Sequence, residues 1–169
     1  MSRFVLIILF LLGALAQPTA AAAKQFVRYE TSAAPGTIVI NPQRRRLYFV
    51  LGGGRAIAYP VGVPKRGWTW SGSASVNGKY KWPDWVPPPA VLVEDPHLPR
   101  FVRGGSPHNP MGARAITLSE FEVAIHGSTR RMRRSIGHAA SHGCIRMRNE
   151  DVIDLYRRVH IGTPVVMLP

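Results

Sequence analysis

The sequence has 169 residues, of which 22 are lysine or arginine and 9 are aspartate or glutamate, so its formal net charge is +13. A chain this basic favours an anionic partner or surface, but charge alone does not identify one. The single cysteine, Cys144, excludes an intramolecular disulfide. Its thiol is therefore buried and inert, paired with another chain, or reactive.

Residues 1–23 have the layout of a secretory signal peptide. Arg3 supplies a positive start, residues 4–12 form an uncharged apolar run, and small residues follow at 14–16 and 20–23. The run is shorter than the about 20 residues that span a bilayer. No twin arginine precedes it, which favours the general secretion route. We expect cleavage after position 23, with cleavage after position 16 or an uncleaved anchor as the alternatives.

Export would place the mature protein in the periplasm or cell envelope. Nucleic acid is not an expected partner there, and no stable membrane insertion is expected once the signal has been removed. The cell wall and the outer leaflet of an outer membrane are the anionic surfaces that the chain would meet. Residues 24–35 are predicted to be a short leader and residues 36–168 a single domain, since no repeat or Gly/Ser linker divides the chain.

The first half of this domain is predicted to be an antiparallel meander of three short strands. Runs rich in β-branched and aromatic residues at 37–40, 47–51 and 56–59 are separated by an Asn-Pro turn signal and by three glycines. Residues 62–112 are dense in glycine, proline and tryptophan. They predict a long, packed loop system over one face of the sheet, because they are too irregular for a helix and too aromatic for a disordered linker.

The second half predicts strands at 113–118 and 121–126, a helix at 150–159 and a last strand at 164–168. Apolar side chains share one face of the helical segment, and Asn149 is expected to cap its N-terminus. The fold class that follows is mainly β (β-rich α+β), a single domain with one prominent helix near the C-terminus.

The chemistry is concentrated around Cys144, whose thiol becomes a useful nucleophile only as a thiolate. His142 is near in sequence, but in an extended segment the two backbones lie about 7 Å apart on the same side. His126 ends a predicted strand and is followed by Gly127, so its ring can be presented into a cleft from a rigid base. Backbone N–H groups at Gly143 and Cys144 are candidates for an oxyanion hole.

These residues resemble the catalytic domain of bacterial L,D-transpeptidases. The motif of that family is a histidine followed, after a short stretch, by Ser/Thr-His-Gly-Cys. Here His126 is followed by Ser-His-Gly-Cys at 141–144, with fourteen residues between. The segments 104–115, 149–156 and 162–165 also look like family segments. The resemblance covers residues 36–168 and implies a β-sandwich.

The resemblance implies that Cys144 is the nucleophile and that His126 accepts and donates the proton. The remaining motif residues would bind the substrate: Ser141, His142, Gly143 and Arg146. His142 and Gly143 would shape the oxyanion hole or orient the donor carbonyl, and Arg146 would pair with a substrate carboxylate, with a structural salt bridge as its alternative. Some members carry an acid or serine after the first histidine. Gly127 stands there, so a backbone carbonyl would have to orient His126.

The implied reaction is an acyl transfer on peptidoglycan tetrapeptide stems. Cys144 would attack the carbonyl between the third residue and the terminal D-Ala, forming a thioester that an amine then resolves. If that amine belongs to another stem, a 3→3 cross-link forms. Water, a free D-amino acid or an envelope protein are open alternatives as acceptor. The resemblance implies no metal or organic cofactor, and it implies sensitivity to carbapenems.

Two rival interpretations use the same residues differently. One is a zinc site with a Cys/His ligand set, although the sequence has no Cys-x-x-Cys or His-Glu-x-x-His. Its ligands would be Cys144, His126, His138 and His142. The other is a wall-binding module without catalysis. Two segments stay open: the arginine-rich run at 130–134 would bind an anionic stem or be a solvated loop, and the tryptophans at 68–85 would pack the core or a lid, or stack on sugars.

Overall fold

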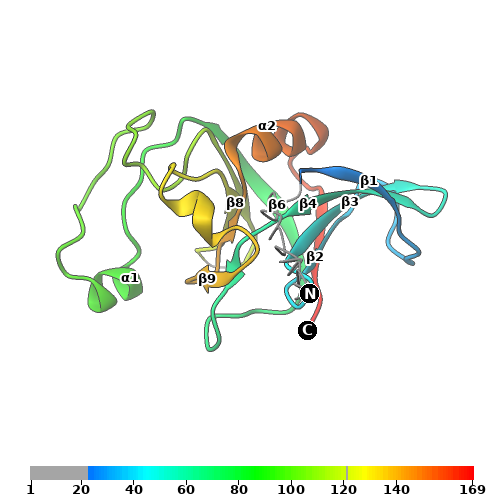
Figure 1. The fold of residues 1–169 in the computed structure, drawn as a ribbon, viewed down its shortest axis with the longest axis horizontal. Helices are drawn as coiled ribbons and strands as arrows, with labels where there is room; N and C mark the ends of the chain where they lie inside the picture. Colours follow the sequence, from blue (N-terminus) through cyan, green and yellow to red (C-terminus); the bar gives the residue numbers. More distant parts are fainter. Residues whose placement is uncertain (1–22, 121) are drawn as a thin grey trace, which may run out of the picture.

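The computed structural model describes residues 23–120 and 122–169 (Figure 1). The predicted signal peptide therefore lies outside the described residues, except for its last position. Within the described ranges, no helix is long and apolar enough to cross a membrane.

Four strands form the first half of a nine-stranded sheet. They are β1 (Gln25–Arg28), β2 (Ile38–Asn41), β3 (Arg46–Gly52) and β4 (Arg55–Pro60). β2, β3 and β4 pair antiparallel in chain order, which confirms the predicted meander. β1, from the segment before it, adds antiparallel to β4.

The second half of the sheet is built from β6 (Gly72–Lys81), β7 (Arg114–Leu118), β8 (Ala124–His126) and β10 (Ile145–Arg146). The last strand, β11 (Pro164–Met167), joins the two halves, since it pairs parallel with β2 and antiparallel with β6. The strand order is β1-β4-β3-β2-β11-β6-β7-β8-β10. The predicted strands at 113–118 and 164–168 are confirmed, whereas the one at 121–126 is shorter than expected and begins at Ala124.

Residues 62–112 differ from the prediction of a loop system without strands. The ten-residue strand β6 lies in this segment, together with β5 (Val63–Pro64) and the short helix α1 (Pro89–Glu94). In β6 the buried positions are Val76 and Gly78, so no alternating apolar pattern marks it. The strand forms because β11 and β7 bond its backbone from both sides.

The predicted C-terminal helix is confirmed as α2 (Asn149–Arg158). Its N-cap is Arg148, with no side-chain capping bond, so the expected cap by Asn149 is wrong. Before α2 lie the short 3-10 helix η1 (Met132–Ser135) and β9 (Ala139–Ser141), which pairs parallel with β5.

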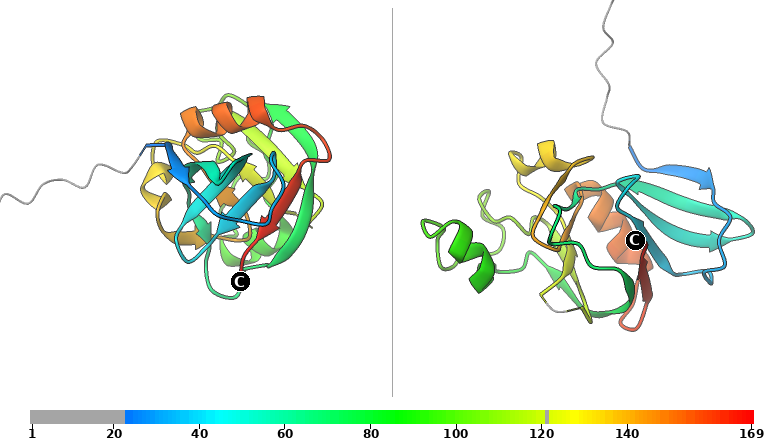
Figure 2. Two further views of the ribbon diagram at one scale, coloured as in Figure 1. Left: turned by 90° about the vertical axis from the view of Figure 1, so that its right-hand side faces the viewer. Right: turned by 90° about the horizontal axis from the view of Figure 1, so that it is seen from below.

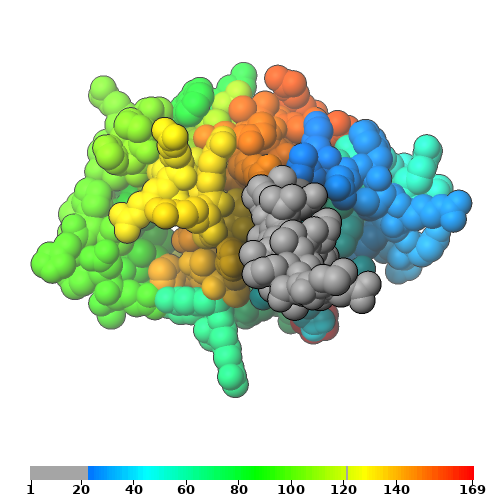
Figure 3. Space-filling view, viewed as in Figure 1, coloured from blue at the N-terminus to red at the C-terminus, as the bar shows by residue number. Residues whose placement is uncertain are grey.

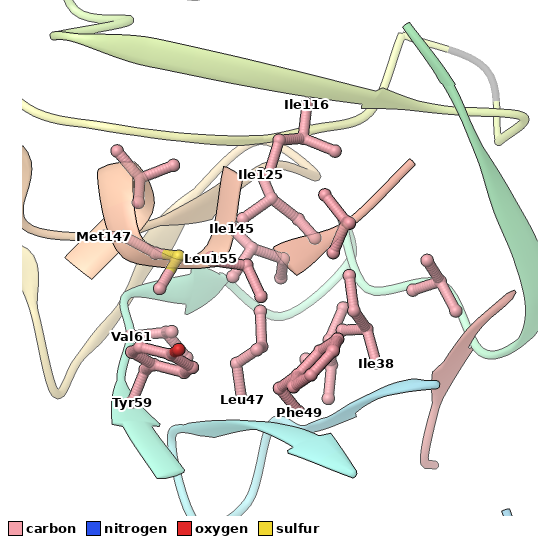
Figure 4. Close-up of a cluster of buried hydrophobic side chains, with 14 of the residues drawn as sticks. Ile38, Leu47, Phe49, Tyr59, Val61, Ile116, Ile125, Ile145, Met147 and Leu155 are labelled. Carbon is pink, nitrogen blue, oxygen red and sulfur yellow. The ribbon is translucent and has the colours of Figure 1, made fainter. Parts of the chain in front are cut away.

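The two halves of the sheet face each other across one apolar core, as a β-sandwich does (Figure 4). Ile116 and Ile125 line it from one side, Leu47 and Phe49 from the other, and Leu155 of α2 packs between them. A second, smaller cluster covers the far face of the meander, where the Tyr29 and Tyr48 rings stack with centroids 4.1 Å apart.

The sandwich has two different ends (Figures 1 and 2). The hairpin of β3 and β4 and the strand β1 extend at one end, and α1 with its long flanking segments lies at the other. In the space-filling view, the segment around residue 130 rises beside that α1 end of the molecule (Figure 3). The short strands β8 and β10 lie between these features; of the two predicted catalytic residues, His126 ends β8 and Cys144 immediately precedes β10.

Candidate active site

The pairing of β8 with β10 brings the motif histidine and cysteine together. The strands are parallel, with Ile145 opposite Ile125 and Arg146 opposite His126. Side chains alternate between the faces of a strand. Because the two isoleucines point into the core, His126 and Arg146 point to the other face. Cys144, two residues before Arg146, shares that face.

A cavity of about 110 Å³ lies over this face of the sheet. Five of the six predicted site residues line it: His126, Ser141, His142, Cys144 and Arg146. Gly143, the sixth, lies in the turn between them. The tryptophans Trp68 and Trp85 also line the cavity, so part of the tryptophan-rich segment encloses the site instead of filling the core.

His126 is held as a neutral base. Its side chain is buried, and Nδ1 lies 2.7 Å from the carbonyl oxygen of Gly127. A carbonyl can only accept, so Nδ1 carries the hydrogen and Nε2 is left as the basic nitrogen. Burial and, to a smaller extent, the charge of Arg146 lower the pKa of His126 to about 4 against the opposing effect of hydrogen bonds to the Gly127 and Pro110 carbonyls. Gly127 thus supplies the orienting carbonyl that could not be assigned from sequence.

Close packing explains why glycine follows His126. A Cβ at Gly127 would collide with Oδ1 of Asn149, which occupies that space. The same oxygen accepts hydrogen bonds from the backbone N–H groups of Ala113 (3.0 Å) and Ser128 (3.2 Å), and Nδ2 of Asn149 donates to the Ser128 carbonyl at 3.2 Å. Instead of capping α2, the Asn149 side chain ties the helix to the segments on both sides of β8.

Cys144 is half-buried, with Sγ 3.7 Å from the carbonyl oxygen of Glu122. Burial raises the pKa of its thiol. A hydrogen bond from the Ala124 backbone and the charge of Arg146 act in the opposite direction, and the Glu122 carboxylate adds to the rise. The raised thiol pKa and the lowered imidazole pKa both favour the neutral forms of Cys144 and His126.

Arg146 is the cation of the cavity. Its Nε is buried and makes no hydrogen bond among the described residues. Burial also lowers the pKa of the guanidinium. Its charge lowers the pKa values of both His126 and Cys144. The same cation therefore favours the neutral form of His126 and the thiolate form of Cys144.

The turn that presents Cys144 is held by its own side chains and backbone. The buried hydroxyl of Ser141 donates to the Cys144 carbonyl, and Nε1 of Trp70 donates to the Gly143 carbonyl at 3.4 Å. Gly143 has φ +112°, and a Cβ there would meet Val123 at an ordinary 3.6 Å. Backbone conformation, not lack of space, therefore requires glycine. Since C=O and N–H point oppositely across a trans peptide, fixing the Gly143 carbonyl also fixes the direction of the Cys144 N–H.

His142 is engaged by residues that the sequence did not point to. Its Nε2 lies 2.6 Å from Oε2 of Glu94, which also lies 2.7 Å from Nζ of Lys65. The Trp68 ring meets the imidazole edge-on at 4.8 Å between centroids. Lys65 and His142 lower the pKa of the Glu94 carboxyl. Because α1 buries none of its own residues, this ion pair is its polar attachment to the site.

The structure does not gather the ligands of the rival zinc site. His138 lies in a different cavity, beside Arg133, Arg134 and Arg148. Across residues 23–120 and 122–169, no three His, Cys, Asp or Glu side chains are grouped as a metal would require. The histidine and cysteine of the motif instead share their cavity with an arginine, whose charge disfavours a bound cation.

Comparison with known families agrees with this geometry. The model of the L,D-transpeptidase catalytic domain, YkuD, matches residues 35–167. The chain belongs to this L,D-transpeptidase family. The curated relative "Probable L,D-transpeptidase YbiS" of Escherichia coli (strain K12) is 36% identical over 140 residues, covering 76% of this chain and 43% of the relative. "Probable L,D-transpeptidase ErfK/SrfK" of the same strain is 34% identical over 142 residues, covering 78% and 43%.

The L,D-transpeptidase-family chain thus spans less than half the length of these curated relatives. Among solved structures, an L,D-transpeptidase from Mycobacterium smegmatis shares the fold, with a TM-score of 0.61, 19% identity and coverage of 79% of this chain and 58% of that one. A Brucella melitensis protein named "Probable carnitine operon oxidoreductase caia" is 40% identical, with a TM-score of 0.58 and coverage of 90% and 96%. The family assignment rests on the domain model and the curated relatives.

Proposed function

We propose that the chain is an exported cysteine L,D-transpeptidase that acts on peptidoglycan tetrapeptide stems in the periplasm. The observation that carries this proposal is the cavity that Cys144 and His126 share, with His126 at the end of β8 and Cys144 directly before the paired strand β10. Because Nδ1 of the buried imidazole donates a hydrogen bond to a carbonyl, Nε2 is the nitrogen that can exchange a proton.

In the first step, Sγ of Cys144 attacks the carbonyl between the third stem residue and the terminal D-Ala while Nε2 of His126 takes the thiol proton. The C–N bond of the tetrahedral intermediate breaks, the leaving D-Ala amine receives that proton, and a thioester remains on Cys144. In the second step, an acceptor amine attacks the thioester, His126 removes its proton, and the protonated thiol leaves. The cycle consumes no cofactor.

Arg146 is suited to hold the carboxylate of the departing D-Ala. It lines the same cavity as the nucleophile, and its buried Nε lacks a partner among the described residues. A guanidinium with a free N–H pairs well with a carboxylate. The positioned Cys144 N–H supports the expectation that the motif turn stabilises the oxyanion.

The acceptor defines which product forms. The side-chain amine of another stem yields a 3→3 cross-link. Water yields a shortened stem, as in an L,D-carboxypeptidase, and an amine on an envelope protein yields an anchored protein. We propose the stem as acceptor, with mass analysis of products from purified muropeptides as the measurement that separates the three.

The acylation step is tested by intact mass spectrometry of residues 24–169 with a carbapenem. We expect one adduct, located on Cys144 after digestion and unaffected by a chelator, and none on a folded Cys144→Ala variant. A zinc-site protein would instead lose structure with chelator and gain no adduct. A wall-binding module would neither form an adduct nor lose structure. A folded protein that stays unmodified at millimolar carbapenem would contradict the proposal.

A further inference from the structure

A second, larger cavity of about 580 Å³ shares Cys144 with the first and extends away from it. Its floor follows the strand ladder from β8 to β6, because Ala124 pairs with Thr117 and Thr117 pairs with Gly78. Paired residues share a face of the sheet. With about 4.8 Å between neighbouring strands, Gly78 lies roughly 14 Å from Cys144 along this row.

The far end of the cavity carries an aromatic ring seated on the sheet. A Cβ at Gly78 would lie 2.7 Å from Cε2 and 2.8 Å from the hydroxyl oxygen of Tyr80. The ring therefore rests against the bare backbone of Gly78, in space that any other residue would fill. Tyr80 lines the cavity and is 50% exposed, so the ring is supported on one side and open to a ligand on the other.

The described polar residues that line this cavity with Tyr80 carry no positive charge. The Thr117 hydroxyl donates to Oδ1 of Asn77 at 2.6 Å, so this bond leaves both donors of the Asn77 amide for another partner. Asp84 and Glu122 also line the cavity, and none of the described residues that line it is a lysine, arginine or histidine. At the Tyr80 end of the cavity, this composition favours a neutral ligand rich in hydroxyl groups.

The length of the donor stem fits the cavity. Three residues separate the scissile carbonyl from the sugar that bears the stem, and an extended peptide of that length spans about 10 Å. A stem that has its carbonyl at Cys144 and follows the row through Ala124 and Thr117 delivers its first sugar close to Asn77 and Tyr80.

We propose that this larger cavity binds the pyranose rings of the glycan strand that carries the donor stem. Tyr80 would stack on a sugar face, and Asn77 and Asp84 would bond its hydroxyl or acetamido groups, as expected of a pocket with an apolar surface and few polar groups. The proposal rests on the proposed function and extends it, since it makes the enzyme specific for stems still attached to their disaccharide.

The test compares two donors, the disaccharide-tetrapeptide and the same tetrapeptide without sugar, by kcat/KM for D-Ala release. We expect the wild type to prefer the disaccharide-tetrapeptide about tenfold. Tyr80→Ala, and independently Gly78→Ala, should remove most of this preference, while Tyr80→Phe should keep it. Phe26→Ala, which removes a 76% exposed ring from β1, is the matched control and should behave as wild type.

A second measurement is independent of turnover. Binding of a peptide-free glycan oligomer to Cys144→Ala protein is followed by tryptophan fluorescence, because Trp85 lines the cavity. We expect saturable binding that Tyr80→Ala weakens about tenfold. If glycan binds but neither donor is turned over, the proposed function falls and the saccharide site stands. Equal kcat/KM for the two donors, equal losses for both in Tyr80→Ala, or no glycan binding would overturn the site.

Discussion

The acid side of the acylation pH profile depends on the burial of His126. Its pKa of about 4 compares with about 6.5 for an exposed histidine. At pH 5.5 an imidazole of ordinary pKa is neutral in about 9% of molecules, and one with a pKa of about 4 is neutral in about 97%. Since the neutral form is the base, we expect acylation at pH 5.5 to be about tenfold faster than an ordinary histidine allows.

Single-turnover acylation of the wild type by a carbapenem, measured from about pH 4 to 8, provides the assay. The rate should be flat from about pH 5.5 to 7.5 and fall to half near pH 4 as His126 becomes protonated. His126→Gln should be slower by roughly 10²-fold and lose this acid limb. Parallel alkylation by iodoacetamide should keep rising with pH above neutrality, because burial raises the pKa of Cys144. Carbapenem decay at each pH is the control.

Three results would refute this reasoning. A wild-type acid limb centred near pH 6.5 would show that the imidazole is not desolvated. An alkylation rate that has already reached its plateau near pH 6 would mean that the resting pair is thiolate and imidazolium. An acid limb that survives in His126→Gln but disappears in His142→Ala would assign the base to the wrong histidine.

Two further predictions concern the supports of the site. Asn149→Ala removes three hydrogen bonds and leaves the N–H groups of Ala113 and Ser128 unsatisfied, so we expect urea unfolding to show a loss of about 2–4 kcal/mol. As a control, Asn41→Ala breaks one exposed hydrogen bond from the Arg44 backbone and should cost under about 1 kcal/mol of unfolding free energy. Equal losses of stability in the two variants would contradict the role given to the Asn149 side chain. Glu94→Gln should accelerate amide hydrogen exchange in α1 while β6 and β7 stay unchanged, whereas Glu150→Gln, a control that weakens a surface ion pair, should not. Unchanged exchange in α1 would show that the ion pair to His142 and Lys65 does not attach it.

The sequence predicted best those elements that carry a strong local signal in their side chains. The meander is built from runs of β-branched and aromatic residues and the helix over α2 has one apolar face; these elements and the strands at 113–118 and 164–168 are all found. β6 was missed because it is stabilised through its backbone, between β11 and β7, with few apolar side chains to mark it. A strand that is stabilised mainly by hydrogen bonds to both neighbouring strands shows little periodic pattern in its own sequence.

Asn149 shows a second limit of sequence reasoning. Its position at the start of a helix suggested a local cap, which is a preference of the residue type. In the folded chain, the backbone groups near Ala113 and Ser128 compete for the same side chain. These partners lie 36 and 21 residues away, so their proximity arises only when β7, β8 and α2 are assembled.

The sequence by itself was enough to predict the family, which the comparisons confirm, and to propose Cys144 and His126 as the catalytic pair, because the chain has one cysteine and the spacing of its motif is specific. Only the tertiary structure decides the direction in which the pKa values of His126 and Cys144 shift, because both depend on burial and on Arg146. It also decided that Gly127 orients the base and that Glu94 engages His142. Burial and contacts between distant segments are properties of the packed chain, and no local pattern encodes them.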